Sequence, residues 1–191
     1  MTHSTHSDLL RGTNLYLIGM MGAGKSTLGT AMAAQLGYRF FDTDTLIEQV
    51  AGTSIPEIFA TSGESGFRDL ESEVLSQLSP YTRLVVATGG GIVLRSENWG
   101  HLRNGVIVWM DVALAELQQR LQGDEQRPLL QREDWPQHLA TLLEQRRELY
   151  AQADIHLGVN AGDSVAELSD RLIALLEERV LPPPSFVQPE G

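Results

Sequence analysis

The chain has 191 residues, the length of one ordinary globular domain, and its 14 Lys and Arg against 25 Asp and Glu give a formal net charge of −11. The absence of cysteine excludes disulfide frameworks, thiol nucleophiles and iron–sulfur clusters. The acidic balance argues against broad binding to nucleic acids or anionic membranes. No targeting or membrane-spanning segment is recognisable, so we expect a cytoplasmic protein. Of the 14 basic residues, Lys25 is the one lysine.

Short apolar runs alternate with longer amphipathic stretches along the chain, which is typical of an α/β fold with a parallel sheet between helices. We expect strands over 14–19, 38–41, 83–87, 106–110 and 155–159. We expect helices over 25–36, 45–50, 54–60, 64–78, 112–121, 135–150 and 164–179. The pattern indicates a single domain over 12–180, a disordered N-terminal tail over 1–11 and a proline-rich C-terminal tail over 181–191. The polar segment 123–134 is long enough to be a lid.

A glycine-rich motif follows the first expected strand and opens the first expected helix. Residues 19–26, GMMGAGKS, match the G-x-x-x-x-G-K-[ST] pattern of a phosphate-binding P-loop in the strand–helix context that this loop requires. In such a loop, backbone N–H groups surround the phosphates, the lysine reaches the β- and γ-phosphates, and the next hydroxyl ligates Mg²⁺. We therefore expect an ATP site at Gly22, Ala23, Gly24, Lys25, Ser26 and Thr27, with Lys25 acting in catalysis and Ser26 on the metal.

Two carboxylates, Asp42 and Asp44, follow the second expected strand, at the end of the sheet where α/β folds bind ligands. One would hold Mg²⁺ through a water molecule, and the other would accept the proton of an attacking hydroxyl. The alternative is helix capping, because Thr45 and Glu48 fit a capping box. Asp111, after the fourth strand, is a weaker candidate for the metal shell and could instead cap the next helix.

Three consecutive glycines end the third expected strand. The segment TGGG at 88–91 has more glycine than a turn requires, so a small polar ligand could approach the main-chain amides of Gly89 and Gly90. This segment is therefore a candidate binding site for the acceptor of a phosphoryl group.

Several arginines could supply positive charge to two anionic substrates. In the segment GESGFRDLE at 63–71, Arg68 is spaced for helical ion pairs with Glu64 and Glu71, which alone would make a surface network. Four more arginines, at 120, 127, 146 and 147, flank the suspected lid. Each could be a solvated charge, but Arg forks also bind carboxylate and phosphate bidentately.

Together these motifs resemble those of the shikimate kinases, P-loop enzymes similar to nucleoside-monophosphate kinases. The family's order and spacing are matched by GMMGAGKST, DTD at 42–44, GESGFRDLE, TGGG, RPLL at 127–130 and RELY at 147–150. Over residues 12–178 the resemblance implies a three-layer α/β/α kinase with a five-stranded parallel sheet and a mobile lid. The implied reaction transfers the γ-phosphate of ATP to the 3-hydroxyl of shikimate, on the route to chorismate and aromatic amino acids.

The resemblance gives several acceptor-side residues a role. Asp44 would bind the shikimate hydroxyls and act as the base, and Asp42 would hold Mg²⁺ through water. Arg68 and Arg147 would bind the shikimate carboxylate, with help from the Gly90 amide. The implied partners are thus ATP with Mg²⁺ and shikimate, bound by a monomer.

On the ATP side, the resemblance implies that Arg127 on the lid folds over the phosphates and acts in catalysis, and that Arg120 packs beside the adenine. One segment departs from the family. Residues 159–163, VNAGD, stand where the family often has a Thr and a Pro-containing adenine loop, so the adenine contacts stay open.

Two other functions remain possible on the sequence alone. A gluconate kinase of the same architecture would also phosphorylate a hydroxylated carboxylate. A non-catalytic nucleotide- or shikimate-binding module would keep the motifs without turnover. A substrate panel distinguishes the first, and ADP release measured against an Asp44→Asn variant distinguishes the second.

Overall fold

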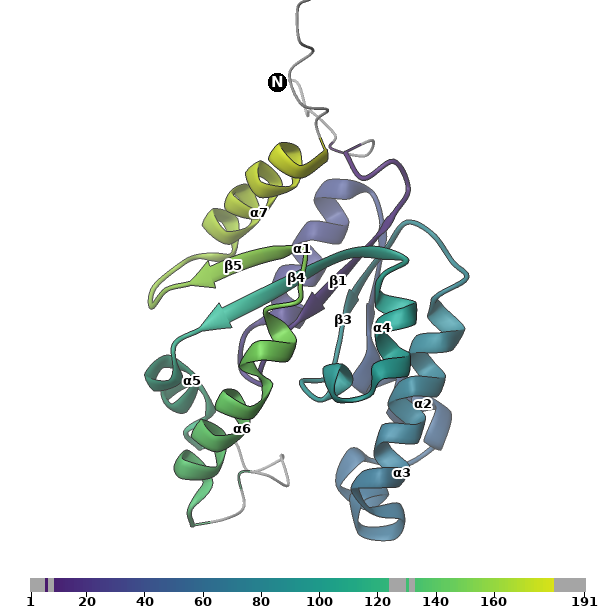
Figure 1. Cartoon of the computed structure of the whole chain (residues 1–191), viewed down its shortest axis with the longest axis vertical. Coiled ribbons are helices and arrows are strands. Elements are labelled where there is room, and N and C mark those ends of the chain that lie inside the picture. Colours follow the sequence, from purple (N-terminus) through teal and green to yellow (C-terminus); the bar gives the residue numbers. More distant parts are fainter. Residues whose placement is uncertain (1–5, 7–8, 124–129, 131–132, 181–191) are drawn as a thin grey trace, which may run out of the picture.

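The computed structural model describes residues 6, 9–123, 130 and 133–180, and it shows one parallel sheet between two layers of helices (Figure 1). Five strands lie in the order β2-β3-β1-β4-β5. They are β1 (Asn14–Ile18), β2 (Arg39–Asp42), β3 (Leu84–Ala87), β4 (Gly105–Val112) and β5 (Ile155–Val159). The helices are α1 (Lys25–Leu36), α2 (Thr43–Ala51), α3 (Ile55–Leu78), α4 (Ser96–Leu102), α5 (Leu114–Leu121), α6 (Trp135–Tyr150) and α7 (Val165–Val180), with a 3-10 turn η2 (Ile92–Leu94). The expected α/β class and five-stranded parallel sheet are confirmed.

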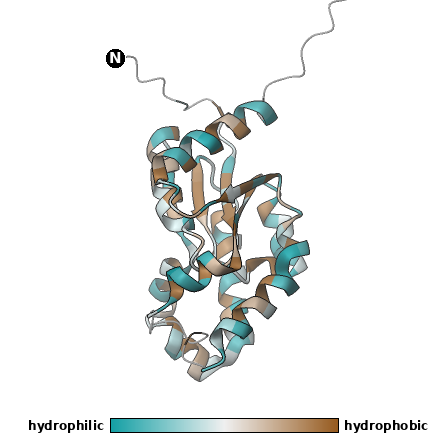
Figure 2. Ribbon diagram, turned by 90° about the vertical axis from the view of Figure 1, so that its left-hand side faces the viewer, coloured by the Kyte–Doolittle hydropathy of each residue, from teal (hydrophilic) through white to brown (hydrophobic). Residues whose placement is uncertain are grey.

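The core lies on both faces of the sheet. Strands β1 and β3 are buried at every position, and Figure 2 shows the strands as the apolar centre of the molecule, with more polar residues on the surrounding helices. Helices α1 and α7 contact each other on one face, while α4 and α6 lie on the other (Figure 1). Because helices cover both faces, the central strands β1 and β3 are buried along their whole length, whereas the edge strand β5 alternates buried and exposed residues.

Glycine conformations shape the turn between β1 and α1. Gly19, Gly22 and Gly24 have φ values of 139°, 76° and 91°, in the region that residues with a Cβ rarely adopt. Gly24 caps α1, and Gly37, with φ 66°, ends it. The predicted helix over 25–36 is therefore confirmed at both ends, and the P-loop backbone is positioned by its own glycines.

The remaining elements differ from expectation in a few places. The two helices expected over 54–60 and 64–78 form the single element α3, which is interrupted at Gly63 by a non-helical φ of 66° and ψ of −174°. Strand β4 continues to Val112, which pairs with Val159, so α5 begins two residues later than expected. Helix α4 and turn η2 were not expected, because these short segments carry no helical periodicity of apolar residues.

The expected tails and lid lie partly or wholly outside the described residues. The tail over 181–191 and most of the segment 123–134 are not described, so the structure does not test them. Leu10, which the sequence assigns to an N-terminal tail, is buried in the core. Within the described part of the chain, no helix combines the length and hydropathy of a membrane span.

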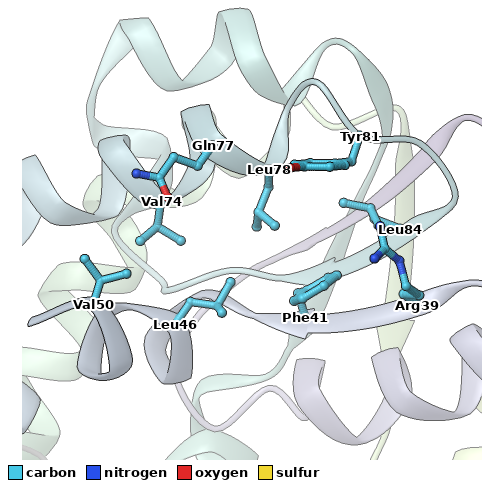
Figure 3. A pocket seen from close by; sticks show the side chains of 9 residues that line it. All are labelled: Arg39, Phe41, Leu46, Val50, Val74, Gln77, Leu78, Tyr81 and Leu84. Atoms are coloured by element: carbon cyan, nitrogen blue, oxygen red, sulfur yellow. The ribbon is translucent and has the colours of Figure 1, made fainter. Parts of the chain in front are cut away.

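A groove of about 320 Å³ lies beside the edge strand β2. Figure 3 shows its lining, with side chains from β2, α2, α3 and β3 surrounding a common space. The Arg39 guanidinium lies 5.6 Å from the ring centroid of Phe41 and 5.9 Å from that of Tyr81. The groove shares no lining residue with the pocket at the P-loop, so the two are separate features.

Candidate active site

A pocket of about 340 Å³ lies where the P-loop meets the carboxyl ends of β2 and β3. Its lining combines the P-loop, both predicted carboxylates and the glycine segment that follows β3. The lining residues are Met21, Gly22, Gly24, Lys25, Ser26, Thr27, Asp42, Asp44, Thr88, Gly89, Gly90, Arg120 and Leu121. The structure therefore brings together three motifs that lie as much as 70 residues apart in the sequence.

Lys25 lies within the P-loop, and its side chain is directed toward the loop backbone. Its Nζ donates hydrogen bonds to the carbonyls of Gly19 at 2.9 Å and Met20 at 2.8 Å. Lys25 is only 8% exposed, and these two hydrogen bonds hold its ammonium against the loop backbone. Ala23 is buried in the turn and does not line the pocket.

Arg120, near the end of α5, reaches the outer side of the P-loop. Its Nε lies 2.8 Å from Oε1 of Glu116, one turn earlier, and its Nη1 lies 3.4 Å from the carbonyl oxygen of Gly22. The guanidinium therefore lies at the mouth of the pocket, consistent with an ATP-side position. Arg127, the other predicted ATP-binding arginine, lies outside the described residues.

Asp42 connects the P-loop to α2. One of its carboxylate oxygens accepts a hydrogen bond from the Ser26 hydroxyl, and the other accepts from the backbone N–H groups of Asp44 at 2.9 Å and Thr45 at 3.4 Å. Helix α2 thus begins at residue 43 with Asp42 as its cap, and the capping box expected at Thr45 and Glu48 is wrong. Asp42 caps a helix and also holds the predicted metal-binding hydroxyl.

Arg68, whose side chain is 12% exposed, and the buried Glu71 form an ion pair beside the glycine segment that follows β3. Arg68 Nη1 contacts Glu71 Oε2, and Nη2 lies 3.1 Å from Oε1 of Glu64. Glu71 is fully buried, so this is not the simple surface network that the spacing alone suggests. Burial raises the pKa of Glu71, which the Arg68 charge and hydrogen bond oppose. Among the described residues, Glu71 Oε1 and Arg68 Nε are buried without hydrogen-bond partners.

The glycines at 89 and 91 are required by the charged side chains beside them. A Cβ on Gly91 would overlap the Arg68 guanidinium, although Gly91 has an ordinary φ of −96°. A Cβ on Gly89 would overlap the Glu71 carboxylate and lie 2.9 Å from Oδ1 of Asp44. The glycine segment therefore allows two carboxylates and a guanidinium to approach the main chain closely.

Two buried hydroxyls hold the peptides on either side of the one that carries the Gly90 N–H. The Gly89 N–H donates to Thr43 Oγ1 at 3.0 Å, and the Tyr150 hydroxyl donates to the carbonyl of Gly90 at 2.6 Å. Both side chains are fully buried. The sequence motifs DTD and RELY contain these residues, but their side chains were not assigned a function from sequence.

Arg146, and not its neighbour Arg147, lies beside Gly90, which lines the pocket. Arg146 is 4% exposed and hydrogen-bonds the Tyr150 phenol, and a Cβ on Gly90 would lie 3.6 Å from its Nη1. The Arg147 side chain is 46% exposed, with its Nη1 3.9 Å from Oδ2 of Asp111. Consecutive residues of an α-helix point about 100° apart, so only one of the two can face the pocket. The structure does not bring Arg147 together with the other predicted acceptor residues.

Asp111 is not at the pocket either. It lies within β4, and its Oδ2 is 2.9 Å from Nε2 of His156, whose ring stacks on Trp109 with centroids 4.2 Å apart. The cap of α5 is Ala113, so the expected capping role of Asp111 is wrong. The Asp111 carboxylate instead contacts His156 and Arg147.

Comparisons with known proteins agree with this geometry. The family model described as shikimate kinase matches residues 21–177. A shikimate kinase of Trichormus variabilis is 54% identical over 170 residues, covering 89% of this chain and 94% of that protein. One of Synechococcus elongatus is 50% identical over 167 residues, covering 87% of this chain and 88% of that protein.

Solved structures give the same result. The shikimate kinase from Acinetobacter baumannii in complex with shikimate has a TM-score of 0.85 and 36% identity, covering 95% of this chain and all of that one. A gluconokinase from Sinorhizobium meliloti has a TM-score of 0.58 at 17% identity, covering 88% of this chain and 94% of that one, which is a likeness of fold alone. On the match of the family model over most of the chain and on these identities, the chain belongs to the shikimate kinase family.

Proposed function

We propose that the chain transfers the γ-phosphate of ATP to the 3-hydroxyl of shikimate, giving shikimate 3-phosphate and ADP. The observation that carries this proposal is a pocket that joins a P-loop to the carboxylate of Asp44 and is lined by Gly90, beside which the guanidinium of the buried Arg146 lies, with the guanidinium of Arg68 beside the next residue, Gly91. This combination suits a substrate with both a reactive hydroxyl and a carboxylate. Membership of the shikimate kinase family supports the same reaction.

The P-loop side would bind ATP. Backbone N–H groups between Gly22 and Gly24 would surround the β-phosphate, and the Lys25 ammonium would exchange its two carbonyl partners for phosphate oxygens. Ser26 and Asp42 present adjacent hydroxyl and carboxylate oxygens, which are donors suited to Mg²⁺ bound together with a nucleotide. When bound, Mg²⁺ neutralises negative charge on the β- and γ-phosphates.

The acceptor side would bind shikimate and remove one proton. The oxygen of the 3-hydroxyl forms the new bond to the γ-phosphorus while the bond to the bridging oxygen of ADP breaks, and the hydroxyl proton passes to Asp44. Arg68, Arg146 and the Gly90 N–H would bind the shikimate carboxylate. We assign this contact to Arg146 in place of Arg147 because Arg146 is buried beside Gly90.

The rest of the proposal concerns parts of the chain around the pocket. Arg120 would pack beside the adenine, which its position at the mouth of the P-loop supports, and Arg127 on a lid over 123–134 would cover the phosphates. The kinase domain over 12–180 would act as a monomer, because residues of one chain supply both halves of the pocket, and its proposed location is the cytoplasm. The net charge of −11 supports small-molecule substrates over nucleic acids or membranes.

Coupled ADP release with Mg-ATP and shikimate tests the proposal. We expect turnover with shikimate, a loss of about 10²–10⁴-fold in Asp44→Asn, and a phosphorus resonance coupled to the proton at carbon 3 of the product. Chelation of divalent metal should stop the reaction, and added Mg²⁺ should restore it. Turnover of gluconate without turnover of shikimate would overturn the substrate assignment. ADP release no faster than in the Asp44→Asn variant would instead indicate a binding protein.

A further inference from the structure

The Tyr150 hydroxyl contacts three parts of the proposed site at once. Tyr150 is the last residue of α6, and its hydroxyl lies 2.6 Å from the carbonyl oxygen of Gly90 and 3.4 Å from the sulfur of Met20 in the P-loop. It also hydrogen-bonds Arg146, one turn earlier on the same helix. One buried phenol therefore links α6, the P-loop and the glycine segment after β3.

A phenol has one proton to donate and an oxygen that can accept, and this determines the donor and the acceptor in each of these contacts. Its single proton goes to the closer and stronger acceptor, the Gly90 carbonyl, and its oxygen accepts from the Arg146 guanidinium, which can only donate. Burial raises the pKa of the Tyr150 phenol, and the charge and hydrogen bond of Arg146 oppose this shift. The hydroxyl keeps its proton at neutral pH, so it remains a donor to Gly90.

Gly90 has no side chain to restrict its backbone, so hydrogen bonds to the neighbouring peptide groups restrict it, among them the 3.2 Å bond from the Ile92 N–H to the Gly89 carbonyl. The peptide carrying the Gly90 N–H lies between two anchored neighbours. The preceding peptide is held through the Gly89 N–H by Thr43, and the following peptide is held through the Gly90 carbonyl by Tyr150. Removing either hydroxyl would release one of these anchors.

We propose that the Tyr150 hydroxyl is a positioning group that sets both donors of the acceptor-carboxylate site, the Arg146 guanidinium and the Gly90 N–H. The inference rests on the proposed function, because it assumes that this end of the pocket binds the carboxylate of shikimate. Tyr150 itself touches no substrate in the proposal. It acts through its hydrogen bonds to Arg146 and Gly90, and its contact with Met20 is longer and weaker.

The ring and the hydroxyl of Tyr150 can be separated by substitution. The ring stacks on Trp109 with centroids 5.9 Å apart, and Tyr150→Phe keeps this packing while removing the hydroxyl. Tyr38 offers a matched control. It is a buried tyrosine whose hydroxyl accepts the backbone N–H of Gly12 at 3.0 Å, and neither residue lines the pocket.

The experiment measures dissociation constants for shikimate and for ADP by titration calorimetry, together with Tm, in wild type, Tyr150→Phe and Tyr38→Phe. We expect Tyr150→Phe to weaken shikimate binding by about five- to thirtyfold and to raise the KM for shikimate more than it lowers kcat. ADP binding should stay within about twofold, and Tyr38→Phe should change neither affinity. Wild-type shikimate affinity in Tyr150→Phe, or equal losses of shikimate and ADP affinity, would overturn the inference.

A second measurement separates positioning from a general loss of packing. In a double-mutant cycle with Arg146→Lys, the combined effect on shikimate affinity should be smaller than the product of the single effects, because Tyr150 acts partly through Arg146. Independent effects would refute the coupling even if Tyr150→Phe lowers Tm. If the wild-type protein did not bind shikimate, this result would refute the proposed function, and the inference that rests on it would be refuted too.

Discussion

The adjacent arginines of α6, Arg146 and Arg147, allow a sharp test, because they differ in exposure and in the residues that they contact. Arg146 is 4% exposed and lies beside Gly90, whereas the Arg147 side chain is 46% exposed and lies 3.9 Å from a carboxylate oxygen of Asp111. We predict that Arg146→Ala destroys much of the affinity for shikimate and that Arg147→Ala leaves it almost unchanged.

The magnitude follows from the contacts that each change would remove. Hydrogen bonds to charged groups contribute about 1.5–3 kcal/mol, and a loss of about 3 kcal/mol corresponds to an increase of about 150-fold in the KM for shikimate. The exposed pair of Arg147 with Asp111 is worth at most about 1 kcal/mol, and it does not line the pocket. We therefore expect a change within about twofold in Arg147→Ala.

The assay is steady-state kinetics at saturating Mg-ATP with shikimate varied, and ADP affinity serves as an internal control. Because a buried charge is removed, Arg146→Lys is measured as well, with Tm for each variant. The lysine keeps the charge but loses the planar fork, so an intermediate effect is expected. A large effect of Arg147→Ala combined with a small effect of Arg146→Ala would refute the assignment.

Four further predictions concern other parts of the chain. An amine-selective reagent should modify the single lysine, Lys25, besides the N-terminus, and mass spectrometry should show that Mg-ATP protects it; modification unaffected by Mg-ATP would contradict its position at the phosphates. Gly91→Ala should displace the Arg68 guanidinium and weaken shikimate binding at least about tenfold while ADP binding persists, as calorimetry can measure. Arg127→Ala should lower kcat more than affinity for shikimate, and a loss of affinity alone would argue against a phosphate contact. The Thr53 and Ser54 hydrogen bonds lower the pKa of Glu57 to about 2 from its usual 4.5, so its stabilising contribution is present above pH 4.5 and is lost toward pH 2; Glu57→Gln should therefore lower Tm at pH 7 and have little effect near pH 2.

The nucleotide side of the molecule could be predicted from sequence because its determinants are local. The P-loop glycines adopt positive φ values within a few residues of the lysine that they present, so a short motif contains both the shape and the chemistry. The bounds of α1 followed from the same residues. Asp42 illustrates the limit of such reasoning. One of its oxygens accepts from the Ser26 hydroxyl and the other caps α2, whereas the sequence offered helix capping, by Thr45 and Glu48, only as the alternative to a functional role for the carboxylates.

The acceptor side depends on helix phase, which single motifs do not reveal. The buried positions of α6 are Leu139, Leu143, Arg146 and Tyr150, so Arg146 occupies a place on the apolar stripe and Arg147 does not. The spacing of these four residues was available in the sequence. Arg146 is the charged residue on this otherwise apolar stripe, so the helical spacing alone would have identified it as the buried arginine.

The same signal exists in α3. Its buried positions include Phe67, Glu71, Val74 and Leu78, which again place one charged residue on an apolar stripe. What the sequence could not supply are the contacts between distant segments. The Tyr150 hydroxyl and the Gly90 carbonyl are 60 residues apart, and their meeting depends on the order of strands in the sheet.

The buried charges around the glycine segment have a consequence for the end of the reaction cycle. Arg68 and Arg146 carry two formal positive charges, and Asp44 and Glu71 carry two formal negative ones, so the cluster is neutral as a whole. A ligand with one carboxylate could therefore bind to the arginines without net electrostatic repulsion from the cluster. The phosphorylated product would add a group with a charge of about −1.5 to −2 in the pocket that Asp44 and Lys25 both line, so repulsion from the carboxylate and attraction to the lysine would act on it in opposite directions.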